Sequence, residues 1–183
     1  MSRIISIVIV IFVAACLPFP HGGYYRPSIE GSASSEMLRR SCGGQVGPEE
    51  ILRLTVEGVE MRVRFKDAGD ALDGHIALTV TAGTRFQFLD GKFVVAGNNR
   101  SVEAFHEGLG FYDVKTRKSV NEPIDTVVHG RDSRSVDLKV PAFTPSRFRL
   151  QVPPFEVNGK RHTLNPIEVE YRAIDVGIYP FNC

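Results

Sequence analysis

The chain has 183 residues, 43% of them hydrophobic, which is enough for a sizeable core and excludes wholesale disorder. Lysine and arginine number 22 against 21 for aspartate and glutamate, so the overall charge favours neither nucleic acid nor an acidic polymer as a partner. Tryptophan is absent, which weakens the case for carbohydrate binding, because sugars often stack on tryptophan.

The first fifteen residues have the three parts of a secretory signal peptide. Met1-Ser2-Arg3 is short and basic, the run 4–13 is apolar except for Ser6, and two alanines then precede Cys16. The apolar run is too short to cross a bilayer, because a membrane-spanning helix needs about 20 apolar residues. The sequence therefore predicts export, with either a lipid anchor or a plain cleaved signal.

The residues Val13-Ala14-Ala15-Cys16 resemble the lipobox of bacterial lipoproteins. In that family the cysteine becomes the mature N-terminus and carries acyl chains. The resemblance thus implies a signal peptide of residues 1–15 and lipidation of Cys16. Leu17 stands where aspartate marks inner-membrane retention in many enteric bacteria. The resemblance therefore implies a protein anchored by lipid in the outer membrane and facing the periplasm, with the membrane as one partner.

Residues 16–40 are expected to form a flexible tether. Prolines and glycines between positions 18 and 27 break regular structure, and the run 31–35 of glycine, serine and alanine has little to bury. As a flexible coil, two dozen residues span roughly 25–30 Å, which would let the domain stand off the bilayer. A short helical turn at 35–40 is the regular element considered there.

The cysteines Cys16, Cys42 and Cys183 bear on the redox state of the domain. If Cys16 is acylated, two cysteines remain in an oxidising compartment, and two cysteines have only one connectivity. We therefore expect a disulfide between Cys42 and Cys183, which would tie the beginning of the domain to its end. The alternative is two free thiols.

Alternating apolar residues predict strands through most of the domain, residues 41–183. Leu52, Leu54 and Val56 share one face, and the phase of the alternation changes across Glu57-Gly58. A two-residue hairpin and a single long strand with a bulge explain this change equally well.

Two further dipeptides predict hairpin turns. Asp90-Gly91 would place Phe88 opposite Phe93, and Asn158-Gly159 would join the short strands on either side of it. The region 96–121 is harder to interpret, and a short helix starting at Ser101 and ending at 107 is expected there. Strands are expected again from 124 onwards, punctuated by prolines.

About eight to ten short strands with little helix predict an all-β fold, an antiparallel β-sandwich. An immunoglobulin-like or transthyretin-like arrangement is expected, with a small barrel as the alternative. A lipid-anchored sandwich of this size is similar in architecture to the transthyretin-like lipoproteins of bacterial secretion machines. That similarity concerns the architecture alone, and no sequence motif supports it.

The pattern of chemical groups predicts no catalytic residue, no metal site and no cofactor. The five histidines lack the close spacing of a zinc pair, and there is neither a G-x-S-x-G elbow nor a phosphate loop. His106, Glu107 and Asp113 are the alternative, as an acid–base group of a cell-envelope hydrolase. A weaker option is a calcium-stabilised adhesive module that uses Asp70 and Asp73.

Basic residues crowd the last third of the chain. Arg147, Arg149, Lys160 and Arg161 would form a basic binding face for anionic lipid, cell-wall polymer or an acidic protein if their strands lie together. An ordinary solvated face neutralised by neighbouring carboxylates is the competing interpretation. The expected function is a non-enzymatic envelope protein that binds a protein or envelope polymer, and not nucleic acid.

Overall fold

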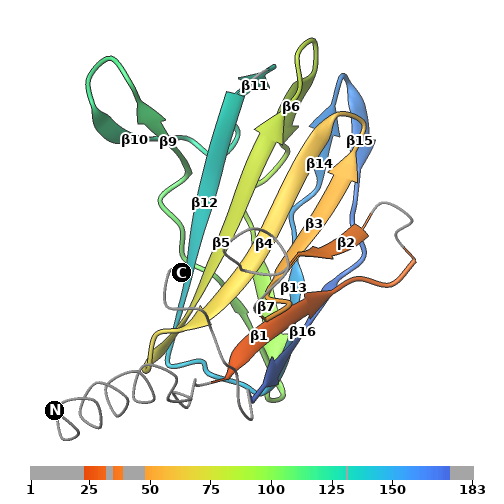
Figure 1. Ribbon diagram of the computed structural model, residues 1–183, viewed down its shortest axis with the longest axis vertical. Coiled ribbons are helices and arrows are strands. Elements are labelled where there is room, and N and C mark those ends of the chain that lie inside the picture. Colours follow the sequence, from red (N-terminus) through yellow and green to blue (C-terminus); the bar gives the residue numbers. More distant parts are fainter. Residues whose placement is uncertain (1–22, 32–34, 39–47, 131, 174–183) are drawn as a thin grey trace, which may run out of the picture.

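The computed structural model describes residues 23–31, 35–38, 48–130 and 132–173, and all the regular structure in these ranges is β-strand. Within them, sixteen strands form antiparallel sheets of seven, five and four strands (Figure 1). The predicted all-β class and antiparallel β-sandwich are confirmed. The immunoglobulin-like and transthyretin-like forms stay predictions.

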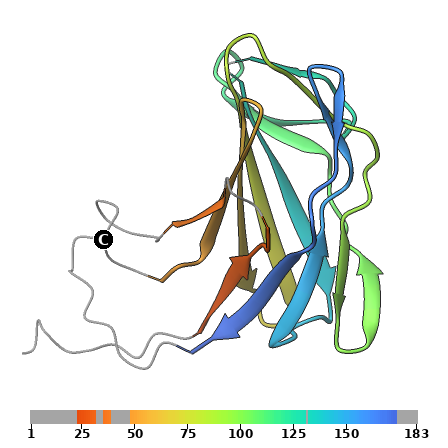
Figure 2. The same ribbon diagram turned by 90° about the vertical axis from the view of Figure 1, so that its right-hand side faces the viewer.

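The seven-stranded sheet forms one layer, and the other two sheets form the second layer (Figure 2). The order in the seven-stranded sheet is β10 (Lys118–Glu122), β9 (Leu109–Asp113), β12 (Asp132–Pro141), β5 (Ala71–Val80), β4 (Val59–Asp67), β3 (Ile51–Val56) and β2 (Ser35–Leu38). The order in the five-stranded sheet is β1 (Tyr24–Ser28), β16 (Ile167–Arg172), β13 (Arg147–Gln151), β7 (Val94–Gly97) and β8 (Arg100–Glu103). The order in the four-stranded sheet is β11 (Val128–His129), β6 (Arg85–Phe88), β14 (Phe155–Val157) and β15 (Lys160–His162).

The core between the layers is rich in phenylalanine. Inward residues alternate with outward ones along each long strand, as the period of two requires. The fully buried aromatic side chains are Phe86, Phe88, Phe93, Phe143, Phe148 and Phe155. Burial of each contributes about 1.5–3 kcal/mol to folding. Many of the rings meet edge to face, as Phe86 and Phe88 do with centroids 4.9 Å apart.

The phase change at Glu57-Gly58 is a two-residue hairpin, and the bulged-strand alternative is excluded. Val56 pairs with Val59 across the turn. Glu57 and Gly58 have φ values of 43° and 88°, so both turn residues are left-handed, as a type I′ turn needs. The turn at Asn158-Gly159 is confirmed in the same way, with φ values of 52° and 83°.

The predicted hairpin at Asp90-Gly91 is wrong. Phe88 ends β6, which pairs with β11 and β14, whereas β7 pairs with β13 and β8, so the chain crosses between two sheets here. Asp90 Oδ1 accepts a hydrogen bond from the N–H of Lys92 at 2.9 Å and so shapes the crossing. Gly91 has no positive φ. A Cβ at this position would lie 2.9 Å from Ile124 Cγ2, so the glycine is needed for space.

The tether predicted for residues 16–40 is wrong where the structure describes it. β1 pairs with β16, and β2 pairs with β3, so both segments belong to the sandwich. Tyr25 in β1 is only 2% exposed and packs edge to face on Phe148 and Tyr171, at 5.5 and 5.3 Å. Its hydroxyl donates a hydrogen bond to the Pro145 carbonyl at 3.1 Å. The strand β2 likewise replaces the helical turn considered there.

The short helix predicted over 101–107 is also wrong. Residues Arg100–Glu103 form β8, which pairs with β7. Beyond it, the backbones of Phe105 and Lys139 exchange two hydrogen bonds of 2.9 and 2.8 Å, which bring this segment to the side of β12. Of the strand expected over 124–128, only Val128 is extended, as the first residue of β11 (Val128–His129).

Candidate functional site

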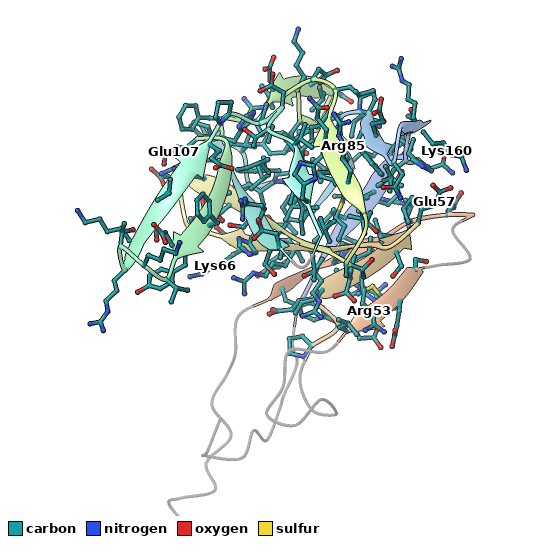
Figure 3. All side chains as sticks on the ribbon, turned by 90° about the horizontal axis from the view of Figure 1, so that it is seen from above. Arg53, Glu57, Lys66, Arg85, Glu107 and Lys160 are labelled. Carbon is teal, nitrogen blue, oxygen red and sulfur yellow. The ribbon has the colours of Figure 1, made fainter. Side chains whose placement is uncertain are left out.

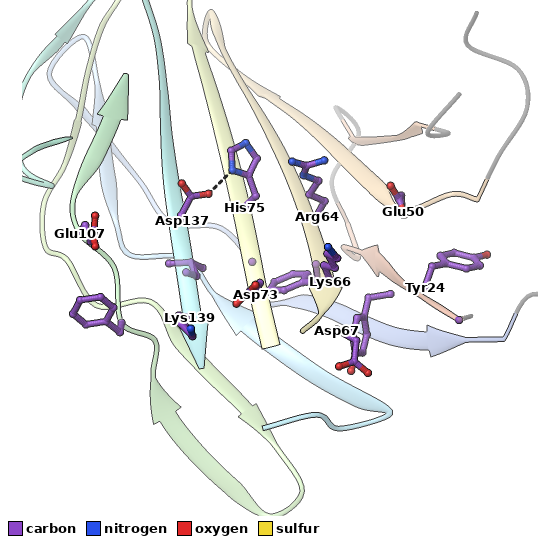
Figure 4. Close-up of a pocket in the computed structure, with 16 residues that line it drawn as sticks. Tyr24, Glu50, Arg64, Lys66, Asp67, Asp73, His75, Glu107, Asp137 and Lys139 are labelled. Carbon is purple, nitrogen blue, oxygen red and sulfur yellow. Dashed lines mark hydrogen bonds and ion pairs between the residues drawn. The ribbon is translucent and has the colours of Figure 1, made fainter. Parts of the chain in front are cut away.

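A groove of about 790 Å³ lies over the outward face of the seven-stranded sheet (Figure 4). Its floor is built by β4, β5 and β12, whose inward positions hold the apolar core and whose outward positions at the groove hold charged residues and His75. In register across these strands, one row is Lys66, Asp73 and Lys139, and the next row is Arg64, His75 and Asp137.

Aromatic and acidic side chains flank this charged floor. Tyr24 and Glu50 line one side of the groove, and Phe105 and Glu107 line the other (Figure 4). The Phe105 ring is 65% exposed, because its backbone is held at the edge of β12 while the ring faces solvent. A ligand would therefore meet ring surface at both sides and charge between them.

The floor of the groove contains one histidine–aspartate pair and three cations that form no ion pair with a described residue. His75 Nδ1 lies 2.6 Å from Asp137 Oδ1, so this pair is already satisfied. By contrast, Arg64, Lys66 and Lys139 form no ion pair with any described residue. Three cations on rigid strands are thus available to an incoming carboxylate or phosphate.

The groove holds one acid–base pair among charged and aromatic side chains. The His75 and Asp137 pair could move a proton. No serine, threonine or cysteine is among the described residues that line the groove. The described lining therefore offers carboxylate, amine, imidazole and phenol groups, but no hydroxyl of serine or threonine and no thiol.

The residues His106, Glu107 and Asp113 are not gathered into an acid–base group, because each serves a separate structural contact. His106 Nε2 lies 2.8 Å from the Gly91 carbonyl, and its Nδ1 accepts a hydrogen bond from the N–H of Gly108 at 3.1 Å. These partners require the neutral ring with its proton on Nε2. His106 therefore locks the crossing segment to the start of β9.

Glu107 and Asp113 serve the hairpin formed by β9 and β10. Glu107 Oε2 accepts a hydrogen bond from Asn121 Nδ2 at 2.8 Å, and Glu107 is the one member of the expected group that borders the groove. Asp113 accepts hydrogen bonds from the Thr116 hydroxyl at 2.7 Å and from the Lys115 N–H at 2.9 Å. These bonds, that of Thr116 above all, hold the Asp113 pKa below its usual value.

The four residues of the expected basic face lie in two sheets. Arg147 and Arg149 are in β13, where Arg149 Nε pairs with Glu168 Oε1 at 2.5 Å. Lys160 and Arg161 are in β15, and Lys160 Nζ pairs with Glu57 Oε1 at 2.5 Å (Figure 3). These strands carry charge that neighbouring glutamates largely neutralise, which favours the ordinary solvated face.

The acidic loop considered for calcium does not gather its carboxylates. Asp67 Oδ1 accepts a hydrogen bond from the Gly69 N–H at 2.7 Å, while Asp73 points into the groove. Within the described ranges, no three histidine, cysteine, aspartate or glutamate side chains are placed to hold a metal ion. Asp70 therefore has no partners for such a site there.

The predicted lipidation of Cys16 and the Cys42–Cys183 disulfide lie outside the described residues and stay predictions. Comparisons with protein-family models, curated proteins and solved structures gave no match. In the part of the chain that the structure describes, no helix has the length and apolar character to cross a membrane. The groove itself was missed in the sequence, although its alternating outward charges were the available signal.

Proposed function

We propose that the chain is a lipid-anchored protein of the outer membrane whose β-sandwich faces the periplasm and binds a protein or envelope polymer without catalysis. The observation that carries the binding function is the groove over β4, β5 and β12, whose cations form no ion pair with a described residue. The anchor and its location are supported by the lipobox-like residues before Cys16.

The groove suits an extended, polar partner. Arg64, Lys66 and Lys139 are not neutralised by any described residue, and Asp73 and Glu107 add carboxylates beside them. A partner with both signs of charge would pair with both sets, while the flanking rings cover its apolar parts. Because long strands fix the backbone of the floor, binding orders few groups that were free before.

The alternative function, a cell-envelope hydrolase, has less support than the binding function. It requires His106, Glu107 and Asp113 to converge, and each is engaged in its own hydrogen bonds. A recognition surface needs no such convergence, since separate charges on one face suffice.

A photoreactive amino acid at position 139, in the groove, tests the binding function in intact cells. We expect a crosslink to one protein or polymer, and we expect Arg64→Glu in the same chain to reduce it at least about tenfold, because reversal of a groove charge sets like charges against each other. Arg85, an exposed cation of β6, provides the matched position outside the groove. Equal crosslinking from positions 85 and 139, or no effect of Arg64→Glu, would contradict the proposal.

The anchor is tested separately by labelling with palmitate. We expect label in the parent chain and none in Cys16→Ala, which should accumulate as precursor with an intact domain. An unlabelled parent chain would refute lipidation and leave the groove function standing.

A further inference from the structure

The hairpin of β9 and β10 stands away from the body of the sandwich (Figure 1). It pairs with β12 at a single position, Ser135 opposite Gly110, and beyond that point the two strands pair only with each other among the described residues. Its tip is the four-residue turn 114–117. A projecting hairpin presents its tip to whatever lies beside the protein.

The tip concentrates positive charge. Lys115, Arg117 and Lys118 are all exposed, and none forms an ion pair with a described residue. Asp113 is the one carboxylate between 112 and 119, and its oxygens already accept bonds from Thr116 and from the backbone of Lys115. Among the described residues, the three cations are therefore left without an ion-pair partner.

Apolar side chains lie beside these cations. Tyr112 is 61% exposed and Val114 is 77% exposed, the largest value among the exposed large hydrophobic residues. Tyr112 and Phe111 alternate along β9, so they face opposite sides of the hairpin. The Phe111 ring is covered by the Arg134 guanidinium at 4.1 Å, whereas the Tyr112 side stays open to solvent.

The base of the hairpin is held firmly. Arg134 Nη1 lies 2.5 Å from Asp132 Oδ1, and its Nε lies 3.6 Å from Glu122 Oε2 in β10. The Glu122 contact and the stacking on Phe111 join the hairpin to β12, whereas the Asp132 pair lies within β12 and orients Arg134. The tip is thus a positioned element, which lowers the entropy lost when it binds.

We propose that the tip of this hairpin docks on an anionic lipid surface. Cations next to an aromatic and an aliphatic side chain are the combination that suits a bilayer interface, where the charges meet the headgroups and the apolar groups enter below them. A soluble polyanion would satisfy Lys115, Arg117 and Lys118 alone and would leave Val114 in water. This proposal is independent of the groove and of acylation at Cys16.

The test measures the affinity of the full chain for two kinds of vesicle. One kind mixes phosphatidylglycerol with phosphatidylcholine, and the other contains phosphatidylcholine alone. Any contribution of an acyl anchor enters both affinities, so their ratio reports the effect of lipid charge. The triple variant Lys115→Gln, Arg117→Gln, Lys118→Gln should lower the ratio about 100-fold, at about fivefold for each cation near the surface. The matched control carries Arg85→Gln, Lys92→Gln and Arg161→Gln, also exposed and without ion pairs among the described residues, and should keep the parent ratio.

A second measurement reports the apolar contact. Because the chain contains no tryptophan, Tyr112→Trp places the only tryptophan at the hairpin, and Leu89→Trp places it at another exposed position. We expect mixed vesicles to shift the emission of Tyr112→Trp to the blue and to leave Leu89→Trp unchanged.

An unchanged ratio in the hairpin variant, or an equal loss in the control, would overturn the proposal. It would also fall if the variant lost binding to a soluble acidic protein or polymer while its vesicle ratio stayed at the parent value. Circular dichroism and thermal unfolding of each variant check that the sandwich is intact.

Discussion

At the scale of single residues, Glu57 links the two layers of the sandwich. It lies in the turn between β3 and β4, and its carboxylate pairs with Lys160 of β15 at 2.5 Å and lies 3.4 Å from His162 Nε2 (Figure 3). The hydrogen bond from Lys160 is the main cause that lowers the Glu57 pKa below its usual value. A turn of one sheet is thereby joined to a hairpin of another.

The lowered Glu57 pKa predicts a pH-dependent contribution to stability. A carboxylate whose pKa is lower in the folded state stabilises the fold above its unfolded pKa, about 4.3. That stabilisation is lost as the pH falls through the folded pKa. Glu57→Gln should therefore have a lower Tm than the parent protein near neutral pH, and the two values should converge in acid.

Thermal unfolding over a pH series measures this difference. Glu36→Gln is a suitable control, because Glu36 pairs with Arg53 within the seven-stranded sheet and links no layers. A Tm difference for Glu57→Gln that stays constant into acid would show that the change acts through packing, and would contradict the charge argument.

The same scale shows why the alternative acid–base group, His106 with Glu107 and Asp113, is not assembled. His106 next to Glu107 has the composition of an acid–base group, but its ring nitrogens face Gly91 and Gly108. The sequence shows that residue 106 is a histidine, but it does not show which groups the ring nitrogens contact. His75 raised no expectation, because its partner Asp137 belongs to a strand far along the chain.

At the scale of elements, local turn chemistry correctly predicted the hairpin at Asn158-Gly159, left a hairpin or a bulge open at Glu57-Gly58, and misled at Asp90-Gly91. Asn158-Gly159 adopts the left-handed φ values that its sequence favours, and Glu57-Gly58 adopts them although glutamate is not among the residues preferred at that position. Asp90-Gly91 has the same signature and forms a crossing between sheets. There Phe88 pairs with Phe155 of β14, a contact that no local pattern encodes.

The first strand was missed because its sequence reads as irregular. Pro27 lies inside β1, and a proline disfavours the centre of a sheet. In the sheet as described, β1 is an edge strand, where the missing N–H is tolerated. The alternation of Tyr25 and Pro27, both on the buried side, was the available signal.

The placement of β1 predicts a large effect for a residue once assigned to the tether. Tyr25→Ala removes a buried ring and its hydrogen bond to Pro145, and should destabilise the domain by about 3–5 kcal/mol. Tyr24→Ala changes a partly exposed neighbour of the same type and should cost less than about 1 kcal/mol. Urea denaturation of both variants measures the difference. Equally small losses of stability in both variants would contradict the placement of β1 in the sandwich.

At the scale of the whole molecule, the class of fold followed from the sequence and the site did not. Alternation predicted the inward and outward faces of β4, β5 and β12. The groove depends on the additional fact that β12 pairs with β5, so that Lys139 lies opposite Asp73. Pairing between distant strands is set by the packing of the complete core, and periodicity within one segment carries no information on it.

The last prediction concerns the predicted disulfide between Cys42 and Cys183. The strand that precedes Cys42 in the sequence is β2, which ends at Leu38 and belongs to the seven-stranded sheet. The strand that precedes Cys183 is β16, which ends at Arg172 and belongs to the five-stranded sheet. A bond between the two cysteines would thus connect segments that follow different layers. It would close a loop of about 140 residues, which in the chain-entropy model corresponds to roughly 5 kcal/mol at most.

Mass spectrometry of the mature protein without reduction should find a peptide that joins Cys42 to Cys183. Serine at either position should lower the Tm and speed proteolysis of the residues after β16, because the bond would restrain the chain in the unfolded state and near Cys183. Reduction of the parent protein should reproduce the Tm of the serine variants, since all three then lack the same bond. Both thiols recovered free from periplasmic material would refute the pairing, and would leave the antiparallel sheets and their buried phenylalanines to hold the two layers together.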